Sequence, residues 1–166
     1  SAARDGPAVA GCCVRGPSAR RRSLFAGGNH EHEDHRGHDH SASVLTDIDL
    51  SFANLTGVDF SGSDLTDTTL RNADASGADF SNATLFDTWF IDATVTGANF
   101  AAANLDEAFF RETIGVTESQ IRSAASFRGA NLWDLNFSGF DLSGMDLTDT
   151  SLSGTDLTAG SLAGSV

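Results

Sequence analysis

The residues best suited to chemistry are five histidines, His30, His32, His35, His38 and His40, which all lie in the segment HEHEDHRGHDH. Imidazoles interleaved with carboxylates are typical ligands of Zn²⁺, Ni²⁺ or Cu²⁺. Their separations of 2, 3, 3 and 2 residues match no closed structural zinc site, and the segment has no apolar residue that would fix its geometry. We therefore favour a solvated polar linker that binds metal weakly through these five histidines, with a defined metal site as the alternative.

The rest of the chain lacks the common catalytic arrangements. All histidines lie in this one segment, so no Ser/His/Asp arrangement is expected elsewhere, and the chain has no lysine to complete a phosphate-binding loop. The many aspartates recur with a repeat, which places them on a convex outer wall instead of in a pocket. We expect no enzymatic activity and no cofactor.

The element that would position these side chains is a repeat with a period of five. Every fifth residue from Leu45 to Phe110 is apolar, and the residue two places earlier is usually small. This period fits neither a helical face nor a strand, but it fits a coil that turns one corner every five residues. In a four-sided coil, residues 20 apart would stack at about the strand spacing of ~4.8 Å. The predicted core is Leu45, Leu50, Phe60, Leu65, Phe80, Leu85, Phe90, Phe100, Leu105, Phe110, Phe127, Leu132, Phe137, Leu142 and Leu147.

The segments ANLTGVDFSGSDL, ADASGADFSNATLF and GANFAAANLDEAFF resemble the pentapeptide-repeat family, whose unit is A-(D/N)-L-x-x. The resemblance implies an all-β fold, a right-handed quadrilateral β-helix with four pentapeptides in each coil. Such a solenoid is stabilised by contacts between neighbouring coils.

The register breaks after Phe110 and resumes two residues out of phase at Phe127. Between them, Thr117 and Gln120 form a capping box that predicts one short α-helix near residues 118–125. We therefore predict a β-helix over residues 43–166, interrupted at 111–126. Residues 1–42, rich first in Arg and Ser and then in His, are predicted to be a disordered tail.

Several outward aromatic and aliphatic residues break the polar pattern of the repeat. Trp89 and Phe109 are 20 residues apart and should stack on one outer face, with Phe86 and Ile91 nearby; Trp133 also points outward. An apolar patch of this kind marks a partner-binding site. The alternative is that the helix at 118–125 folds back and covers these residues.

The outer aspartates should form columns along the rod. Asp59 and Asp79 are 20 residues apart, with Asn99 next in line. Neighbouring carboxylates raise one another's pKa, so we expect stability to fall as the pH rises and to recover on mild acidification or added salt.

The net charge of the chain argues against two classes of partner, nucleic acids and membranes. The net charge is −13 at pH 7, which repels nucleic acid and anionic membranes, so we expect neither direct nucleic-acid binding nor membrane insertion. The leading hypothesis is a structural or interaction protein, monomeric or weakly oligomeric, that presents the flat faces of an acidic rigid rod to a protein partner. The alternative is a DNA-mimicking regulator of a type II topoisomerase, a role that the family resemblance makes available.

The N-terminal segment bears on localisation. Residues 1–28 are rich in Arg, Ser and Ala and poor in acid, which resembles an organelle transit peptide. A helical break between two blocks of repeats also resembles plant and cyanobacterial members of the family. We expect the chloroplast thylakoid lumen, with the cytoplasm as the alternative.

Overall fold

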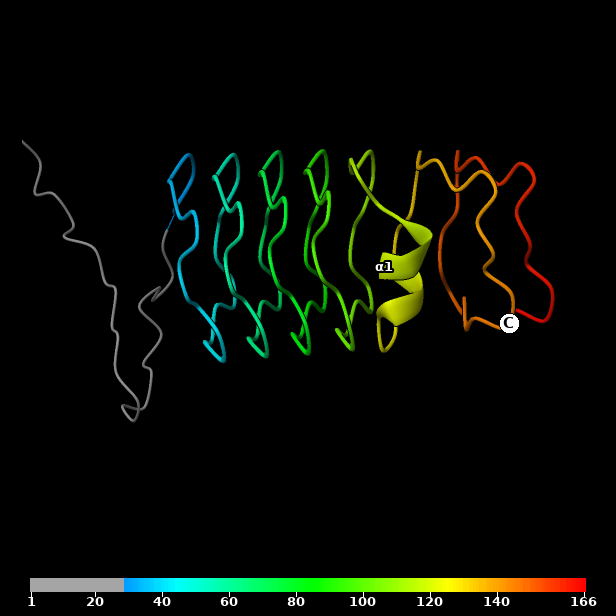
Figure 1. Cartoon of the computed structure of the whole chain (residues 1–166), viewed down its shortest axis with the longest axis horizontal. Helices are drawn as coiled ribbons and strands as arrows, with labels where there is room; N and C mark the ends of the chain where they lie inside the picture. Colours follow the sequence, from blue (N-terminus) through cyan, green and yellow to red (C-terminus); the bar gives the residue numbers. More distant parts are fainter. Residues whose placement is uncertain (1–28) are drawn as a thin grey trace, which may run out of the picture.

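The structure is a computed structural model that describes residues 29–166, in which the chain winds as a regular coil along the long axis of the molecule (Figure 1). Successive coils are joined by single parallel β-bridges between residues 20 apart, such as Asp59 to Asp79 and Asp79 to Asn99. The backbone hydrogen bonds follow the same spacing, since the Phe60 amide donates to the Asp79 carbonyl at 2.8 Å. Each coil is therefore stabilised by its two neighbours, as the period of five predicts.

A tight turn directly after the inner residue of each five-residue unit makes the corner. In the unit that begins at Leu70, the Ala73 amide donates to the Leu70 carbonyl at 3.0 Å, and Asn72 adopts a φ of 57°. Asn and Asp tolerate this left-handed conformation better than most residues, which explains why the repeat favours them here beside glycine. Asp67 at 58° and Ala102 at 57° occupy the same position in other units.

The interior is filled by one large side chain from each unit. Phe60, Phe80 and Phe100 form a stacked ladder with ring centroids 5.2 Å apart, and Phe90 stacks on Phe110 at 4.9 Å. The predicted core residues from Leu45 to Leu142 are all buried, whereas Leu147 is only partly buried. The core therefore thins toward the C-terminal end, where Leu162 is 44% exposed.

The coil starts earlier than the sequence predicted. Bridges pair Asn29 with Asp49, Asp34 with Asn54, and Asp39 with Asp59. The prediction of a disordered tail up to residue 42 is therefore wrong for residues 29–42, which belong to the first coil of the solenoid (residues 29–48). The predicted tail at 1–28 lies outside the described residues.

The one helix of the described residues, α1 (Glu118–Ser123), interrupts the coil near its C-terminal third (Figure 1). Thr117 caps it, since Thr117 Oγ1 accepts from the Gln120 amide at 3.3 Å and Gln120 Oε1 accepts from the Thr117 amide at 2.7 Å. The predicted capping box is thus present. The helix ends before the predicted residue 125 because Ala124 is already extended, with a ψ of 151°.

The interruption is shorter than predicted at both ends. Ile114 still bridges to Thr94, and Ser126 already bridges to Asn104, 22 residues earlier. The two extra residues in that spacing are the phase shift seen in the sequence. No helix within residues 29–166 has the length and apolar character needed to cross a membrane.

Candidate functional site

An aromatic pair interrupts the polar outer surface of the solenoid. Trp89 bridges to Phe109 in the next coil, and their ring centroids lie 5.0 Å apart at an angle of 45°. Trp89 remains 37% exposed, and its indole Nε1 donates to Asp87 Oδ1 at 3.1 Å. The bond to Asp87 fixes the orientation of the indole while leaving part of its surface in water.

Ile91 and Trp133 lie on the same face, two positions further along their units. The Asp92 amide donates to the Arg111 carbonyl at 3.1 Å, and the Glu112 amide donates to the Trp133 carbonyl at 3.3 Å. Ile91, Arg111 and Trp133 therefore follow one another from coil to coil. Trp133 is 37% exposed and Ile91 is half-buried.

Phe86 lies on the other side of the turn at Asp87 and is 42% exposed. The structure thus brings together the five residues predicted for partner binding on one face and its adjoining corner. We call this surface the aromatic face; its residues are Phe86, Trp89, Ile91, Phe109 and Trp133.

A shallow surface groove continues the aromatic face toward the first coil. Trp89 and Phe52 are its apolar residues, and Arg71 is its one basic residue. The sequence did not predict this groove, because its residues come from separate coils. The remaining lining is polar or acidic and consists of Glu31, Asp49, Ser51, Asp67, Thr69, Asn72 and Asp87.

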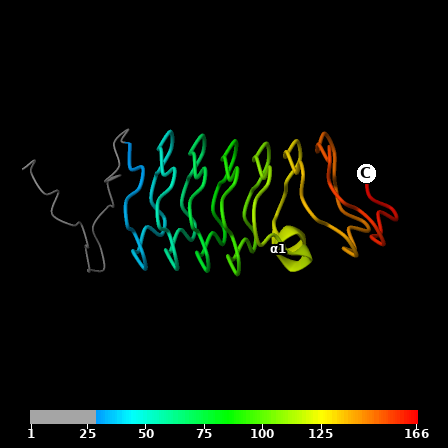
Figure 2. The ribbon, with the colours of Figure 1, turned by 90° about the horizontal axis from the view of Figure 1, so that it is seen from above.

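Helix α1 does not cover the aromatic face, so the predicted alternative is wrong. The hydrogen bonds of Gln120 Nε2 go to the carbonyls of Val95 at 2.9 Å and Ala98 at 3.0 Å. Arg122 donates to the Asp141 carbonyl at 2.5 Å. Figure 2 shows α1 projecting from one side of the coil. The helix is therefore hydrogen-bonded to other sides of the coil, those formed by residues after Val95, and it leaves the aromatic face exposed.

The five histidines take three kinds of position. His30, His35 and His40 precede Leu45 at intervals of five and occupy the inner position of their units; His35 is 5% exposed. His38 takes the place of the small residue two before the inner position. His32 lies outside and stacks on Phe52 with centroids 4.8 Å apart. The structure therefore gathers four of the predicted ligands at the end of the solenoid and separates His32 from them.

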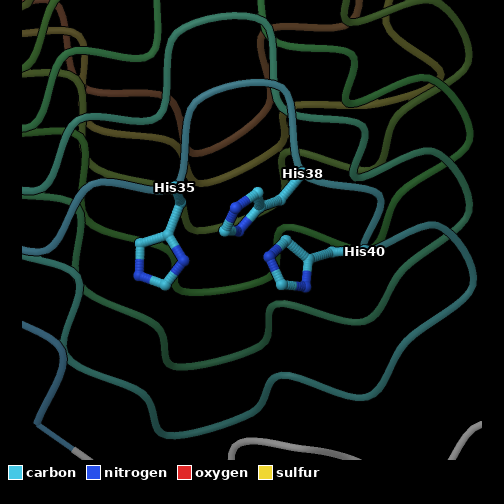
Figure 3. Close-up of side chains that lie close together, drawn as sticks. All are labelled: His35, His38 and His40. Atoms are coloured by element: carbon cyan, nitrogen blue, oxygen red, sulfur yellow. The ribbon is translucent and has the colours of Figure 1, made fainter. Parts of the chain in front are cut away.

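His35, His38 and His40 face a common space (Figure 3). Their ligating atoms lie within 4.8 Å of one another, as do those of His30, Glu33 and His35. Burial lowers the pKa of His35, although the Glu33 carboxylate opposes this shift. Burial also lowers the pKa of His40 to about 4, with His35 and His38 adding to the effect. The buried imidazoles are therefore neutral at pH 7, the form that binds metals.

The sequence contained a signal for this cluster that was missed. Counting back from Leu45 by five reaches His40, His35 and His30. The apolar residues at this interval begin only at Leu45, and histidine is not an apolar core residue, so the apolar pattern alone does not include the first coil. The period itself, without regard to residue type, identifies the first coil.

Comparison with known families agrees with this architecture. The family model described as pentapeptide repeats matches residues 43–82, 78–114 and 125–162, in eight copies. These segments cover more than half of the chain and omit α1. The chain belongs to the pentapeptide-repeat family. The predicted family is confirmed. No curated protein matches the chain.

Solved structures of pentapeptide-repeat proteins are similar to this one. A trypsin-treated form of QnrB1, a plasmid-mediated fluoroquinolone resistance protein, is 20% identical over 88% of this chain and 84% of its own, with a TM-score of 0.54. A pentapeptide-repeat protein from the Arabidopsis thaliana thylakoid lumen is 28% identical over 70% of this chain and 79% of its own, with a TM-score of 0.47. HetL from the cyanobacterium Nostoc sp. strain PCC 7120 is 20% identical over 87% of this chain and 91% of its own, with a TM-score of 0.49. The similarity to QnrB1 supports the fold alone.

The acidic columns of this pentapeptide-repeat protein are built into its turns. Asp59 Oδ1 accepts from the Ser61 amide at 2.9 Å, and Asp79 Oδ1 accepts from the Ser81 amide at 2.9 Å. Asn99 Nδ2 also donates to Asp79 Oδ1 at 3.0 Å. The column is therefore a series of hydrogen-bonded turn residues, and carboxylate repulsion is only one of its interactions.

Most of the shifted carboxyl pKa values move opposite to the prediction. The Ser76 hydroxyl and amide donate to Asp74 and lower its pKa. Asp67 behaves as predicted, because burial and then Asp87 raise its pKa. Hydrogen bonds within the turn lower the pKa of three further residues, Asp141, Asp146 and Asp156.

These shifts reverse the expected pH dependence. A carboxyl whose pKa is lower in the folded state stabilises the protein above its ordinary value of 3.8, and this stabilisation is lost as the pH falls through the folded pKa. Asp74→Asn should therefore be slightly less stable than the wild type at pH 7, and the difference should vanish below pH 3.8. Thermal melts of both proteins from pH 7 to pH 3 measure it.

The asparagine variant is a matched control because Asn54 and Asn104 already accept the same turn bond. The histidines are common to both proteins, so their titration cancels in the difference. A difference that instead grows on acidification would mean that carboxylate repulsion dominates at Asp74.

Proposed function

We propose that this pentapeptide-repeat protein is a non-enzymatic interaction protein, an acidic rigid rod that binds a protein partner through its aromatic face. The observation that carries the proposal is the stacked pair of Trp89 and Phe109, partly exposed on a surface that is otherwise polar and acidic. We propose that the coil is the right-handed quadrilateral β-helix of the family. The flat sides of such a β-helix would suit contact with a flat surface of a partner protein.

The composition of the aromatic face supports a protein partner. Trp, Phe and Arg are enriched at protein interfaces, and tryptophan is frequent among the residues that dominate binding energy. Arg71 and Arg111 lie in the same column of residues as Ile91 and Trp133. The Arg111 guanidinium is already within 3.5 Å of Asp134. The face therefore combines aromatic anchors with two arginines, Arg71 and Arg111, among neighbouring carboxylates.

The rigidity of the face also favours this role. Trp89 and Phe109 sit on bridged residues of neighbouring coils, and their amides donate to the Thr68 and Thr88 carbonyls at 3.0 and 2.9 Å. Because the backbone is fixed, binding would order few side chains, which lowers its entropic cost.

The proposed location is the thylakoid lumen, on the composition of residues 1–28 and the resemblance to plant members of the family. A fusion of the full chain to a fluorescent protein, followed by fractionation of plastids, tests it. Recovery in the stroma or the cytoplasm would contradict this location without affecting the proposed interaction.

Loss of the aromatic pair should abolish partner binding. The double variant Trp89→Ser, Phe109→Ser removes both rings from the outer surface, so we expect it to lose proteins that the wild type retains from a lumen extract. The measurement is quantitative mass spectrometry of proteins bound to each immobilised chain. Binding energy is concentrated in such anchors, so the expected loss is at least tenfold for a specific partner.

The control variant is Val44→Ser, which removes an exposed apolar side chain from another side of the rod. A partner that is specific for the aromatic face is retained by Val44→Ser and lost by the double variant. If all three chains retain the same proteins to the same extent, the aromatic face is not the binding surface.

The alternative, a DNA-mimicking regulator of a type II topoisomerase, rests on the acidic columns. It predicts that the purified chain inhibits DNA supercoiling by gyrase and that Asp59→Asn with Asp79→Asn relieves the inhibition. We expect no inhibition, because the distinctive surface of this chain is aromatic. Inhibition that depends on these two aspartates would favour the alternative.

A further inference from the structure

The geometry points to a binding site for one divalent transition metal ion, formed by His35, His38 and His40 at the N-terminal end of the solenoid. These side chains come from the first coil, on a different part of the molecule from the aromatic face. The inference is therefore independent of the proposed function.

The three imidazoles form a nearly equilateral triangle. Their ring centroids are 5.6 Å apart for His35 and His38, 5.8 Å for His35 and His40, and 5.9 Å for His38 and His40. Three imidazoles bound to one Zn²⁺ at ~2.0–2.1 Å have centroids about 5 Å apart in tetrahedral geometry. A contraction of less than about 1 Å would therefore complete the coordination, a movement that side-chain rotation supplies.

Glu33 supports the orientation of His35. Its Oε2 lies 3.1 Å from His35 Nε2, while Figure 3 shows the other ring nitrogen of His35 turned toward His38. A metal-bound histidine usually donates its second ring N–H to a carboxylate, which fixes the tautomer and increases the basicity of the ligand. Glu33 is therefore a positioning residue for the site, and it also lies 3.0 Å from His30 Nδ1.

The place of these residues in the repeat explains why the site is held together. His35 and His40 occupy inner positions, and His40 continues the phenylalanine ladder by stacking on Phe60 at 5.6 Å. Behind the two imidazoles, the inner space is lined by apolar side chains: Leu45, Ile48, Leu50, Leu55 and Phe60. This apolar lining and the stacking on Phe60 hold the two imidazoles in place on the side of the solenoid interior.

The chemical class of the ion follows from the ligands. Neutral imidazoles suit Zn²⁺, Ni²⁺ and Cu²⁺, whereas Mg²⁺ and Ca²⁺ prefer oxygen ligands. A metal bound to His35, His38 and His40 would also crosslink the first coil of the described residues. We therefore expect binding to raise the melting temperature of the whole chain.

The test is a titration of the full chain with Zn²⁺, followed by calorimetry, and melts with and without the ion. We expect each chain to bind one Zn²⁺ ion, this binding to require His38, and the bound ion to raise the melting temperature. His38→Ala should weaken binding at least tenfold, and its melting temperature should no longer respond to Zn²⁺. Alanine is the usual residue at this position of the repeat, as at Ala78 and Ala98, so this variant should fold.

His32→Ala is the matched control, because His32 stacks on Phe52 outside the cluster. It should bind Zn²⁺ as the wild type does. Cys12 and Cys13 are present in all three chains, so they cannot cause a difference. Equal affinity of His38→Ala and the wild type would overturn the inference. So would an equal loss in both variants, or binding without a rise in melting temperature, since each indicates chelation without the folded site.

Discussion

Replacing Phe80 by alanine is expected to lower the free energy of unfolding by about 3–5 kcal/mol, the usual cost of Phe→Ala in a close-packed core. Phe80 is fully buried and stacks on Phe60 and Phe100 with centroids 5.2 Å apart. It also meets the edge of Phe90 at 5.6 Å. The cavity would lie between coils on both sides, so neighbouring units could not close it without breaking their own bridges.

Urea unfolding followed by circular dichroism measures this loss. The control is Leu162→Ala, also an inner residue of the repeat but 44% exposed at the open C-terminal end, for which we expect a cost of no more than about 1 kcal/mol. Equal losses for the two variants would mean that stability does not depend on the stacked interior.

The burial of Leu45 could not be predicted from the apolar pattern of the repeat. A β-helix that begins at residue 43 would place Leu45 in the terminal coil, where truncation to alanine should cost little stability. Leu45 is 1% exposed, because the coil of His30, His35 and His40 precedes it. Leu45→Ala is now expected to cost about 2–5 kcal/mol, the range for a buried leucine.

The period of five was sufficient to predict the solenoid. Phe60, Phe80 and Phe100 stack because they are 20 residues apart, and the capping box of Thr117 and Gln120 predicted α1. Such features are local or strictly periodic, so spacing along the chain becomes spacing in the molecule. The family resemblance rests on the same period and is confirmed by the matches at 43–82, 78–114 and 125–162.

The candidate sites were less predictable because they depend on where side chains meet across coils. Residue spacing predicted that Trp89 lies beside Phe109. The side of the coil against which α1 packs depends instead on the hydrogen bonds of Gln120 to the carbonyls of Val95 and Ala98, which the spacing does not predict. The histidine spacing of 2, 3, 3 and 2 matched no known zinc site. Only the fold shows that His35, His38 and His40 point into one space while His32 points away.

A substitution at Gly115, where the chain leaves the coil toward α1, is also expected to lower the free energy of unfolding strongly. Gly115 occupies an inner position of the repeat, one residue after the bridge at Ile114, and has a φ of 83°. A Cβ at Gly115 would lie 2.2 Å from Thr96 Oγ1, 2.7 Å from Thr96 Cα and 2.8 Å from Thr96 N. The Thr96 backbone cannot retreat freely, because its carbonyl accepts from the Gly77 amide at 2.9 Å.

Gly115→Ala should therefore lower the free energy of unfolding by about 2–5 kcal/mol, combining left-handed strain of ~1–2 kcal/mol with overpacking of ~1–3 kcal/mol. The matched control is Gly97→Ala, where φ is 69° but no atom lies within 4 Å of the added Cβ. Ala102 adopts a φ of 57° at the equivalent turn position, so this control carries conformational strain alone and should cost about 1–2 kcal/mol. Urea unfolding of both variants isolates the steric contribution of Thr96. If the two alanine variants unfold at the same urea concentration, the close approach of Gly115 to Thr96 adds no steric cost to the backbone strain that both variants share.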